Sequence, residues 1–95
     1  MAAEIKNSEF SKEMMKEVVT RTLKLKIEEI NQKLINTHET IRYFEKKYGM
    51  RTEEFYKRFL AGELGDDMDL FEWKASKEIS DELNGEKRVL LEAIG

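Results

Sequence analysis

The sequence predicts an all-α protein, and three observations carry this prediction. The 95 residues contain no proline, and Lys and Glu supply most of the charged 39%, a composition that favours helix. Apolar residues recur at spacings of three and four between Leu23 and Tyr48, which indicates a long amphipathic helix. Glycines at positions 49, 62 and 65 then divide the second half of the chain. We expect one helical domain over residues 1–95.

The first predicted helix runs from about residue 9 to residue 48. Its apolar positions are spaced 4, 3, 4, 3, 4, 3 and 4, the heptad pattern of a helix that buries one stripe. We call these positions the heptad seam; they are Leu23, Ile27, Ile30, Leu34, Thr37, Ile41, Phe44 and Tyr48. Such a seam must pack against the chain's own later helices, a second copy or a different protein.

Residues 18–26 allow a second interpretation. They begin with two valines, and apolar and charged side chains alternate after Thr22, which also fits a short strand. A strand that leads into a helix is typical of dimeric ribbon-helix-helix regulators, whose paired strands enter the major groove of DNA. The helix that would follow is long for that fold. We therefore prefer a continuous helix and keep the strand as the alternative.

A short helix is expected after the long one. Gly49 should end the long helix in the left-handed conformation. Thr52 is a suitable N-cap for a helix over about 52–61, because its hydroxyl can accept a hydrogen bond from the first turn. Phe55 and Phe59 lie four positions apart and should form the buried side of that helix.

One or two further helices should complete the fold. Asp66 or Asp67 is expected to cap a helix over about 67–84. The dipeptide Asn84-Gly85 reads as a stop signal before a last short helix over about 86–94. The buried side of the longer helix is expected to consist of Leu70, Phe71, Ala75, Ile79 and Leu83.

Charge is unevenly distributed, although the net charge is only −3. Residues 42–58 carry six bases against three acids, whereas residues 59–85 carry eight acids against two bases. Solvated helix faces can explain such blocks, and electrostatic complementarity to a protein partner is the alternative. Because acids repel a phosphate backbone, we do not expect nucleic acid to bind the C-terminal half.

No group of residues predicts catalysis, a cofactor or a metal. The chain has no cysteine and a single histidine, His38, so neither a nucleophilic triad nor a zinc site is expected. Asp66, Asp67 and Asp69 are of the type that binds Mg²⁺ or Ca²⁺. Acids at the start of a helix are, however, equally expected from capping and the helix dipole. We expect a protein that is not an enzyme and binds no cofactor.

The composition also indicates the cellular compartment of the protein. A chain without cysteine is typical of a reducing, cytoplasmic setting, and no apolar run approaches the roughly 20 residues that cross a bilayer. The first ten residues, MAAEIKNSEF, lack the apolar run of a secretion signal. We expect a cytoplasmic protein that does not associate with membranes.

The stretch 43–75 resembles a known family. It contains the pattern KYGM-x-x-EEF and then F-x-x-G-x-LGDD-x-D-x-F-E-W. This pattern resembles that of small archaeal and bacterial proteins that are similar to the antitoxin partners of toxin–antitoxin pairs. The matching residues are Lys47–Met50, Glu54, Phe55, Phe59, Gly62, Leu64–Asp67, Asp69 and Phe71–Lys74. The resemblance implies a protein partner, the cognate toxin, and it brings no catalytic residues with it.

The expected interaction residues come from the seam and from the aromatic and acidic segment 43–73, which we call the elbow. Phe71 and Trp73 point to roughly opposite sides of a helix, so one should enter the core and leave the other for a partner. The candidates are Leu23, Ile27, Ile30, Leu34, Ile41, Phe44, Tyr48, Phe55, Phe59, Asp66, Asp67, Asp69, Phe71 and Trp73. We expect a protein-interaction module that acts as an antitoxin-like partner; a homodimeric structural protein and the DNA-binding regulator are the alternatives.

Overall fold

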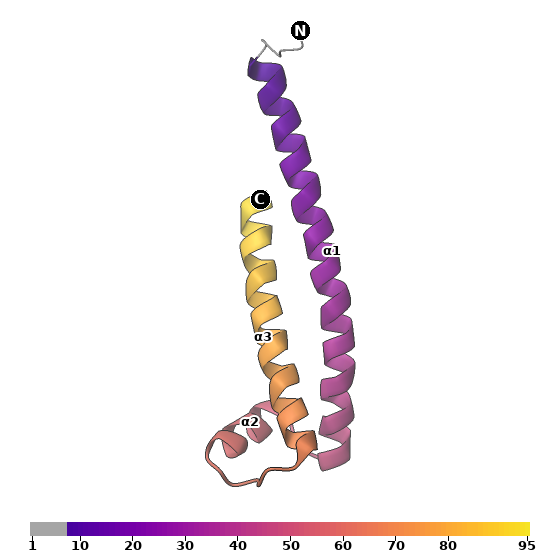
Figure 1. Ribbon diagram of the computed structural model, residues 1–95, viewed down its shortest axis with the longest axis vertical. Helices are drawn as coiled ribbons and strands as arrows, with labels where there is room; N and C mark the ends of the chain where they lie inside the picture. The colour runs from indigo at the N-terminus through magenta and orange to yellow at the C-terminus, as the bar shows by residue number, and fades with distance from the viewer. Residues whose placement is uncertain (1–7) are drawn as a thin grey trace.

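The computed structural model describes residues 8–95, with side chains from Ser11 onward. The predicted domain also included residues 1–7, which lie outside the described residues. Every regular element in the described part is helical, which confirms the all-α prediction: α1 (Ser8–Tyr48), α2 (Thr52–Leu60) and α3 (Met68–Ile94). α1 and α3 form an antiparallel hairpin and α2 lies at its closed end (Figure 1). The molecule is elongated, at 67 × 22 × 21 Å.

Residues 18–26 lie within α1, so the strand alternative is wrong. The ribbon-helix-helix interpretation therefore loses the paired strands on which it rested. A strand needs a hydrogen-bonded neighbour, and the described chain offers none. As a helix, the same segment brings Leu23 and Ile27 onto one side, where both are half-buried.

The heptad seam faces α3, so the chain itself supplies the seam's partner. Ile30, Leu34 and Phe44 are buried, while Tyr48 at the end of α1 remains 37% exposed. The other four seam positions are half-buried: Leu23, Ile27, Thr37 and Ile41. Thr37 is tolerated because its hydroxyl donates to the Lys33 carbonyl oxygen at 2.8 Å. Most predicted seam contacts are thus internal to the hairpin rather than open to another protein.

α3 runs without interruption from Met68 to Ile94, so the predicted stop at Asn84-Gly85 is wrong. The glycines with positive φ are Gly49, Gly62 and Gly65, and Gly85 is not among them. A glycine inside a helix costs about 1 kcal/mol relative to alanine. Packing along α1 continues past this point, with Leu90 and Ile94 half-buried, and offsets that cost.

The buried side of α3 also differs from the predicted one. Leu70, Trp73 and Ser80 are buried, whereas Phe71 and Ile79 remain about half exposed. Residues spaced four apart, as in the predicted set, drift by about 40° per step around a helix. The seam of α1 instead accepts residues spaced alternately three and four apart. This periodicity places Trp73, rather than Phe71, against α1.

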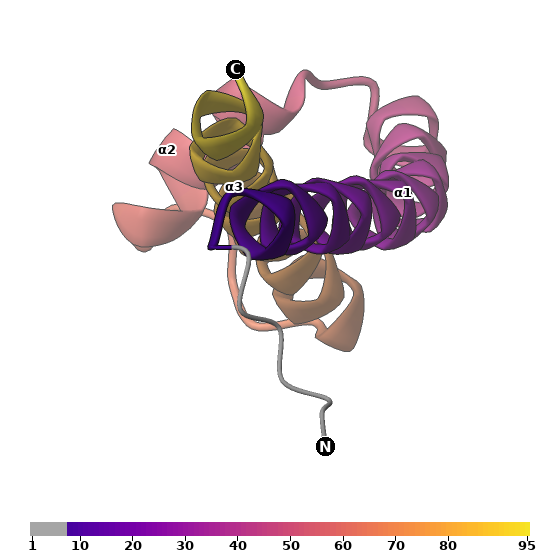
Figure 2. The ribbon, with the colours of Figure 1, turned by 90° about the horizontal axis from the view of Figure 1, so that it is seen from above.

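The turn after α1 is confirmed. Gly49 has a φ of 62°, the left-handed conformation that most residues avoid, and the Met50 N–H donates to the Glu45 carbonyl at 3.3 Å. This turn lets α2 leave at a steep angle to the hairpin. Seen along the long axis, α2 lies to one side of α3, away from the base of α1 (Figure 2).

Two glycine substitutions should have opposite effects on stability. Gly85→Ala should raise the free energy of unfolding by about 0.5–1 kcal/mol, because the site is helical and nothing lies within 4 Å of an added Cβ. Gly49→Ala should lower it by about 1 kcal/mol, because its φ is positive. Urea unfolding followed by circular dichroism measures both. Destabilisation by Gly85→Ala would instead mean that the helix breaks there.

Candidate protein-interaction surfaces

Trp73 occupies the centre of the elbow. Its side chain and that of Phe55 have no exposed surface, and their rings stack with centroids 3.9 Å apart and planes 1° apart. Phe44 and Tyr48 from α1 stack against the same indole at centroid distances of 5.8 and 5.7 Å. Aromatic rings from all three helices therefore meet at one residue.

A chain of hydrogen bonds joins the same three helices. The Trp73 indole N–H donates to Thr52 Oγ1 at 3.0 Å, and the Thr52 hydroxyl donates to Glu45 Oε2 at 2.7 Å. Glu45 Oε2 also accepts the Thr52 backbone N–H at 3.0 Å. Each buried donor in this chain has an acceptor, so the hydrogen bonds offset the cost of removing these polar groups from water.

The predicted role of Thr52 as an N-cap is wrong. Arg51 holds the cap position and its side chain makes no capping bond, while Thr52 is the first helical residue. The carboxylate of Glu45, from α1, accepts the free N–H at the start of α2 instead. A negative charge at the positive end of the helix dipole is favourable. Sequence could not reveal this cap because Glu45 belongs to a different helix.

A second polar cluster fastens the end of α1 to the start of α3. Lys47 Nζ and Tyr48 Oη both donate to Asp69 Oδ2, at 2.6 and 3.0 Å. The bond from Lys47, followed by that from Tyr48, lowers the pKa of the Asp69 carboxyl from its usual value. Partial burial and the bond to Asp69 raise the pKa of the Tyr48 hydroxyl. Asp69 thus links the end of α1 to the start of α3, and its charge is already paired with that of Lys47.

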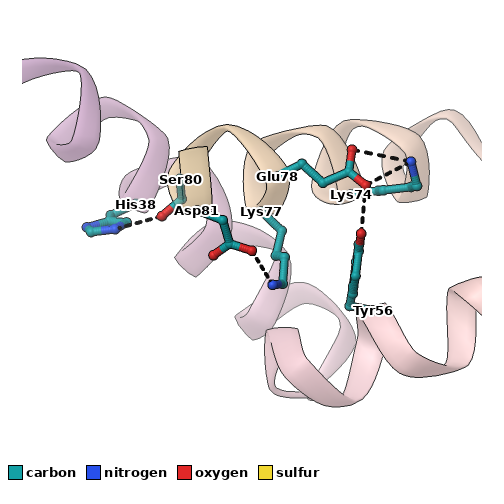
Figure 3. Close-up of polar contacts among 7 residues, drawn as sticks. All are labelled: His38, Tyr56, Lys74, Lys77, Glu78, Ser80 and Asp81. Carbon is teal, nitrogen blue, oxygen red and sulfur yellow. Dashed lines mark hydrogen bonds and ion pairs between the residues drawn. The ribbon is translucent and has the colours of Figure 1, made fainter. Parts of the chain in front are cut away.

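Figure 3 shows polar contacts of α3, both within the helix and with α1 and α2. Tyr56 of α2 donates to Glu78 at 2.7 Å, and Lys74 also contacts that carboxylate. Lys77 pairs with Asp81 and lies over the Tyr56 ring, 4.7 Å from its centroid. Further along the hairpin, His38 of α1 shares a 3.3 Å hydrogen bond with the buried Ser80. The hydrogen bond to Ser80 gives His38 a structural role between α1 and α3.

The other loop acids are not paired in this way. Asp67 stands at the cap position of α3 as predicted, but its side chain makes no capping bond. Asp66 and Asp67 are both exposed, and the ion pairs found within residues 8–95 do not include them. In that part of the chain, no group of three or more His, Asp or Glu side chains is arranged to hold a metal ion. The predicted acidic loop is therefore a charged surface.

Exposed apolar side chains adjoin these acids. Phe71 is 48% exposed and packs edge-on against Phe59 of α2, with centroids 5.3 Å apart. Met68, one helical turn before Phe71, is 81% exposed. We call Phe59, Met68 and Phe71 the elbow patch. Four exposed acids lie close to these residues in the sequence: Glu63, Asp66, Asp67 and Glu72.

The N-terminal part of α1 carries a second exposed apolar surface. Met14, Met15, Val18, Val19 and Leu25 are all about half or more exposed. α3 ends before it reaches most of them (Figure 1). The predicted interaction residues did not include them, although a spacing of 4, 3, 4 and 3 from Ser11 to Leu25 is visible in the sequence.

The structure therefore divides the predicted interaction residues into two groups. Ile30, Leu34, Phe44, Phe55 and Trp73 form the interior of the hairpin and its elbow. The other seam residues among them are half-buried, apart from the exposed Tyr48. Phe71, Asp66 and Asp67 lie at the surface. Among the described residues, no helix is both long and apolar enough to cross a membrane.

Comparison with known proteins gives no match to a protein-family model, to a curated protein or to a solved structure. The functional proposal below therefore rests on the surfaces of the chain itself.

Replacing the hydroxyl of Thr52 should destabilise the elbow. Thr52→Val leaves the buried Trp73 N–H without an acceptor, so the free energy of unfolding should fall by about 1–3 kcal/mol. Thr52→Ser retains the hydroxyl and should cost less. Urea unfolding, followed by Trp73 fluorescence, measures both variants. A larger loss for Thr52→Ser than for Thr52→Val would show that the methyl group, and not the hydroxyl, matters.

Removing Lys47 should change the titration of Asp69. Because the pKa of Asp69 is lowered in the fold, its stabilising contribution is present above the unfolded pKa and is lost as the pH falls through the folded pKa. Lys47→Met should raise the Asp69 pKa and shift this loss to higher pH. Carboxyl-carbon NMR titration measures the pKa directly. Lys46→Met is the control and should leave it unchanged.

Proposed function

We propose that this chain is a non-enzymatic protein-interaction module whose elbow binds a basic protein partner. One observation carries the proposal: apolar side chains are exposed beside acids that make no ion pair within residues 8–95. Large exposed apolar side chains are typical of binding surfaces. The rigid aromatic core beneath Phe71 holds the patch in place, which limits the entropy lost on binding.

Electrostatics indicates the chemistry of the partner. The segment 59–85 has a net charge of −6, and the lysines of this segment already contact Glu78 and Asp81. A partner with a basic surface would be attracted to the elbow patch and oriented by it. Phe71 and Met68 would then enter an apolar depression at the centre of that basic surface.

The resemblance described above narrows the proposal to one kind of partner. The elbow contains the whole of the resembling pattern except its last residue, Lys74. We infer that the partner is a small basic toxin that handles nucleic acid and that the acidic elbow covers its working surface. Binding would then neutralise the toxin by occupying the site that otherwise binds a phosphate backbone.

The test is affinity purification of the tagged full chain from its native host, with mass spectrometry of the bound material. We expect a small basic protein in roughly equimolar amount, and co-expression of the two should relieve growth inhibition caused by that protein alone. Recovery of the chain with no stoichiometric partner contradicts the proposal.

Elbow variants should then weaken binding of the identified partner. Phe71→Ala should raise the dissociation constant about tenfold or more, because a central aromatic anchor is lost. The control Ile79→Ala removes a similarly exposed residue of α3 and should have little effect. Surface plasmon resonance gives both values, and circular dichroism confirms that each variant is folded.

Charge reversal tests whether the acids of the elbow attract the basic partner. Asp66→Lys with Asp67→Lys should slow association and reduce its salt dependence. Glu82→Lys with Glu86→Lys changes the net charge equally but lies far from the elbow, so association should change less. Equal effects of the two pairs would mean that net charge, and not the elbow, steers the partner.

A further inference from the structure

A small pocket lies at the closed end of the hairpin, where α1 ends and the loop between α2 and α3 returns (Figure 1). Its floor consists of Phe55, Leu70 and Trp73, which are all buried. Phe55 and Trp73 are the stacked pair of rings at the centre of the elbow. The pocket therefore has an apolar floor that the core of the elbow already holds in place.

Four residues form the rim of the pocket, and one of them is acidic. Tyr48, Met50 and Leu64 are partly exposed, and Asp67 is exposed. Partial burial, the bond to Asp69 and then the charge of Asp67 raise the pKa of the Tyr48 hydroxyl, so the Asp67 carboxylate lies near Tyr48. Asp67 makes no ion pair within residues 8–95, and its charge is available to a binding partner.

The bases of the turn after α1 lie outside this pocket. Met50 also borders a second depression, which is lined by Arg42, Lys46 and Arg51. The rim is therefore acidic at Asp67, whereas bases begin beyond Met50. A positively charged group that approaches the pocket is attracted towards Asp67 and repelled from the Met50 side.

The pocket adjoins the elbow patch. Asp67 immediately precedes Met68 in the chain, and Phe59 of the patch packs against Phe55 of the floor, with ring centroids 5.6 Å apart. A partner that covers Met68 and Phe71 is therefore also brought over the pocket. Such a surface offers the partner exposed apolar side chains and, beside them, a depression that can receive an apolar side chain in return.

We propose that the pocket receives one aliphatic side chain of the basic partner, of about the size of leucine, and that a lysine or arginine beside it in the partner pairs with Asp67. Because it assumes the basic partner described above, this assignment rests on the proposed function. It adds the kind of sequence that the partner must present to the elbow.

The size and chemistry of the pocket select this occupant. Its volume of about 130 Å³ is roughly four times the volume of one water molecule in the liquid, which suits an aliphatic side chain rather than a large aromatic one. A lysine or arginine that entered head first would place its charge against the apolar floor, which is costly. The apolar side chain therefore enters, and the base stays at the rim with Asp67.

Short capped peptides test the pocket without the natural partner. The probe is acetyl-Arg-Leu-Arg-amide, titrated into the full chain and followed by NMR. We expect it to shift the methyl signals of Met50, Leu64 and Leu70, with a dissociation constant on the order of 1–10 mM. Two controls, acetyl-Arg-Gly-Arg-amide and acetyl-Glu-Leu-Glu-amide, lack the side chain or the charge. Each should bind at least about tenfold more weakly.

Three results would overturn the proposal. Equal binding of the Arg-Gly-Arg peptide would mean that charge alone attracts the probe. Unchanged methyl signals with every peptide would mean that the pocket does not admit a side chain. Methyl signals that change when the chain alone is diluted would assign the pocket to a second copy of the chain.

Neutralising one acid tests the pairing at the rim. Asp67→Asn keeps a residue that suits the N-cap position and should weaken binding of the Arg-Leu-Arg peptide about two- to fivefold. The matched control is Asp66→Asn, which removes the same charge from a neighbour that does not line the pocket and should weaken binding less. Equal effects of the two variants would contradict a pair with Asp67. Circular dichroism confirms that both variants are folded.

Failure of the pocket and failure of the proposed function give different results. Recovery of a basic partner by affinity purification, without methyl shifts from the Arg-Leu-Arg peptide, overturns the pocket assignment and leaves the elbow as the binding surface. Methyl shifts from this peptide, without any recovered partner, support the pocket and contradict the proposed function.

Discussion

The position of Trp73 is the constraint on which the rest of the structure depends. Its indole stacks on Phe55 of α2 and Phe44 of α1, and its N–H begins the hydrogen-bonded chain through Thr52 to Glu45. Stacking acts on the faces of the indole and hydrogen bonding on its edge, so together they fix both the distance and the rotation of the three helices. The angle of α2, and with it the elbow patch, follows from that fixed arrangement.

The hairpin has one large internal contact and two exposed surfaces with different chemistry. The elbow combines apolar side chains such as Met68 and Phe71 with acids that make no ion pair within residues 8–95. The N-terminal part of α1 instead exposes Met15, Val18 and Leu25 among charged side chains of both signs.

Much of the fold follows from local sequence. The heptad spacing from Leu23 to Tyr48 predicts α1 and its buried side, and Gly49 is confirmed at the turn that ends it. Such features depend on side-chain periodicity and backbone conformation, which short segments already contain. The elbow was also identified as a unit, because aromatic residues, glycines and a change of charge coincide there. Of Phe71 and Trp73, one was expected in the core and the other outside it, as is observed.

What the sequence by itself determined, then, is the helical content, the seam of α1 and the glycine turn. The tertiary structure alone decided that Trp73 rather than Phe71 is buried, that Glu45 caps α2, and that α3 continues through Gly85. The physical reason is the same in each case. Local preferences in these segments differ by about 1 kcal/mol or less, and packing against a helix distant in sequence outweighs them.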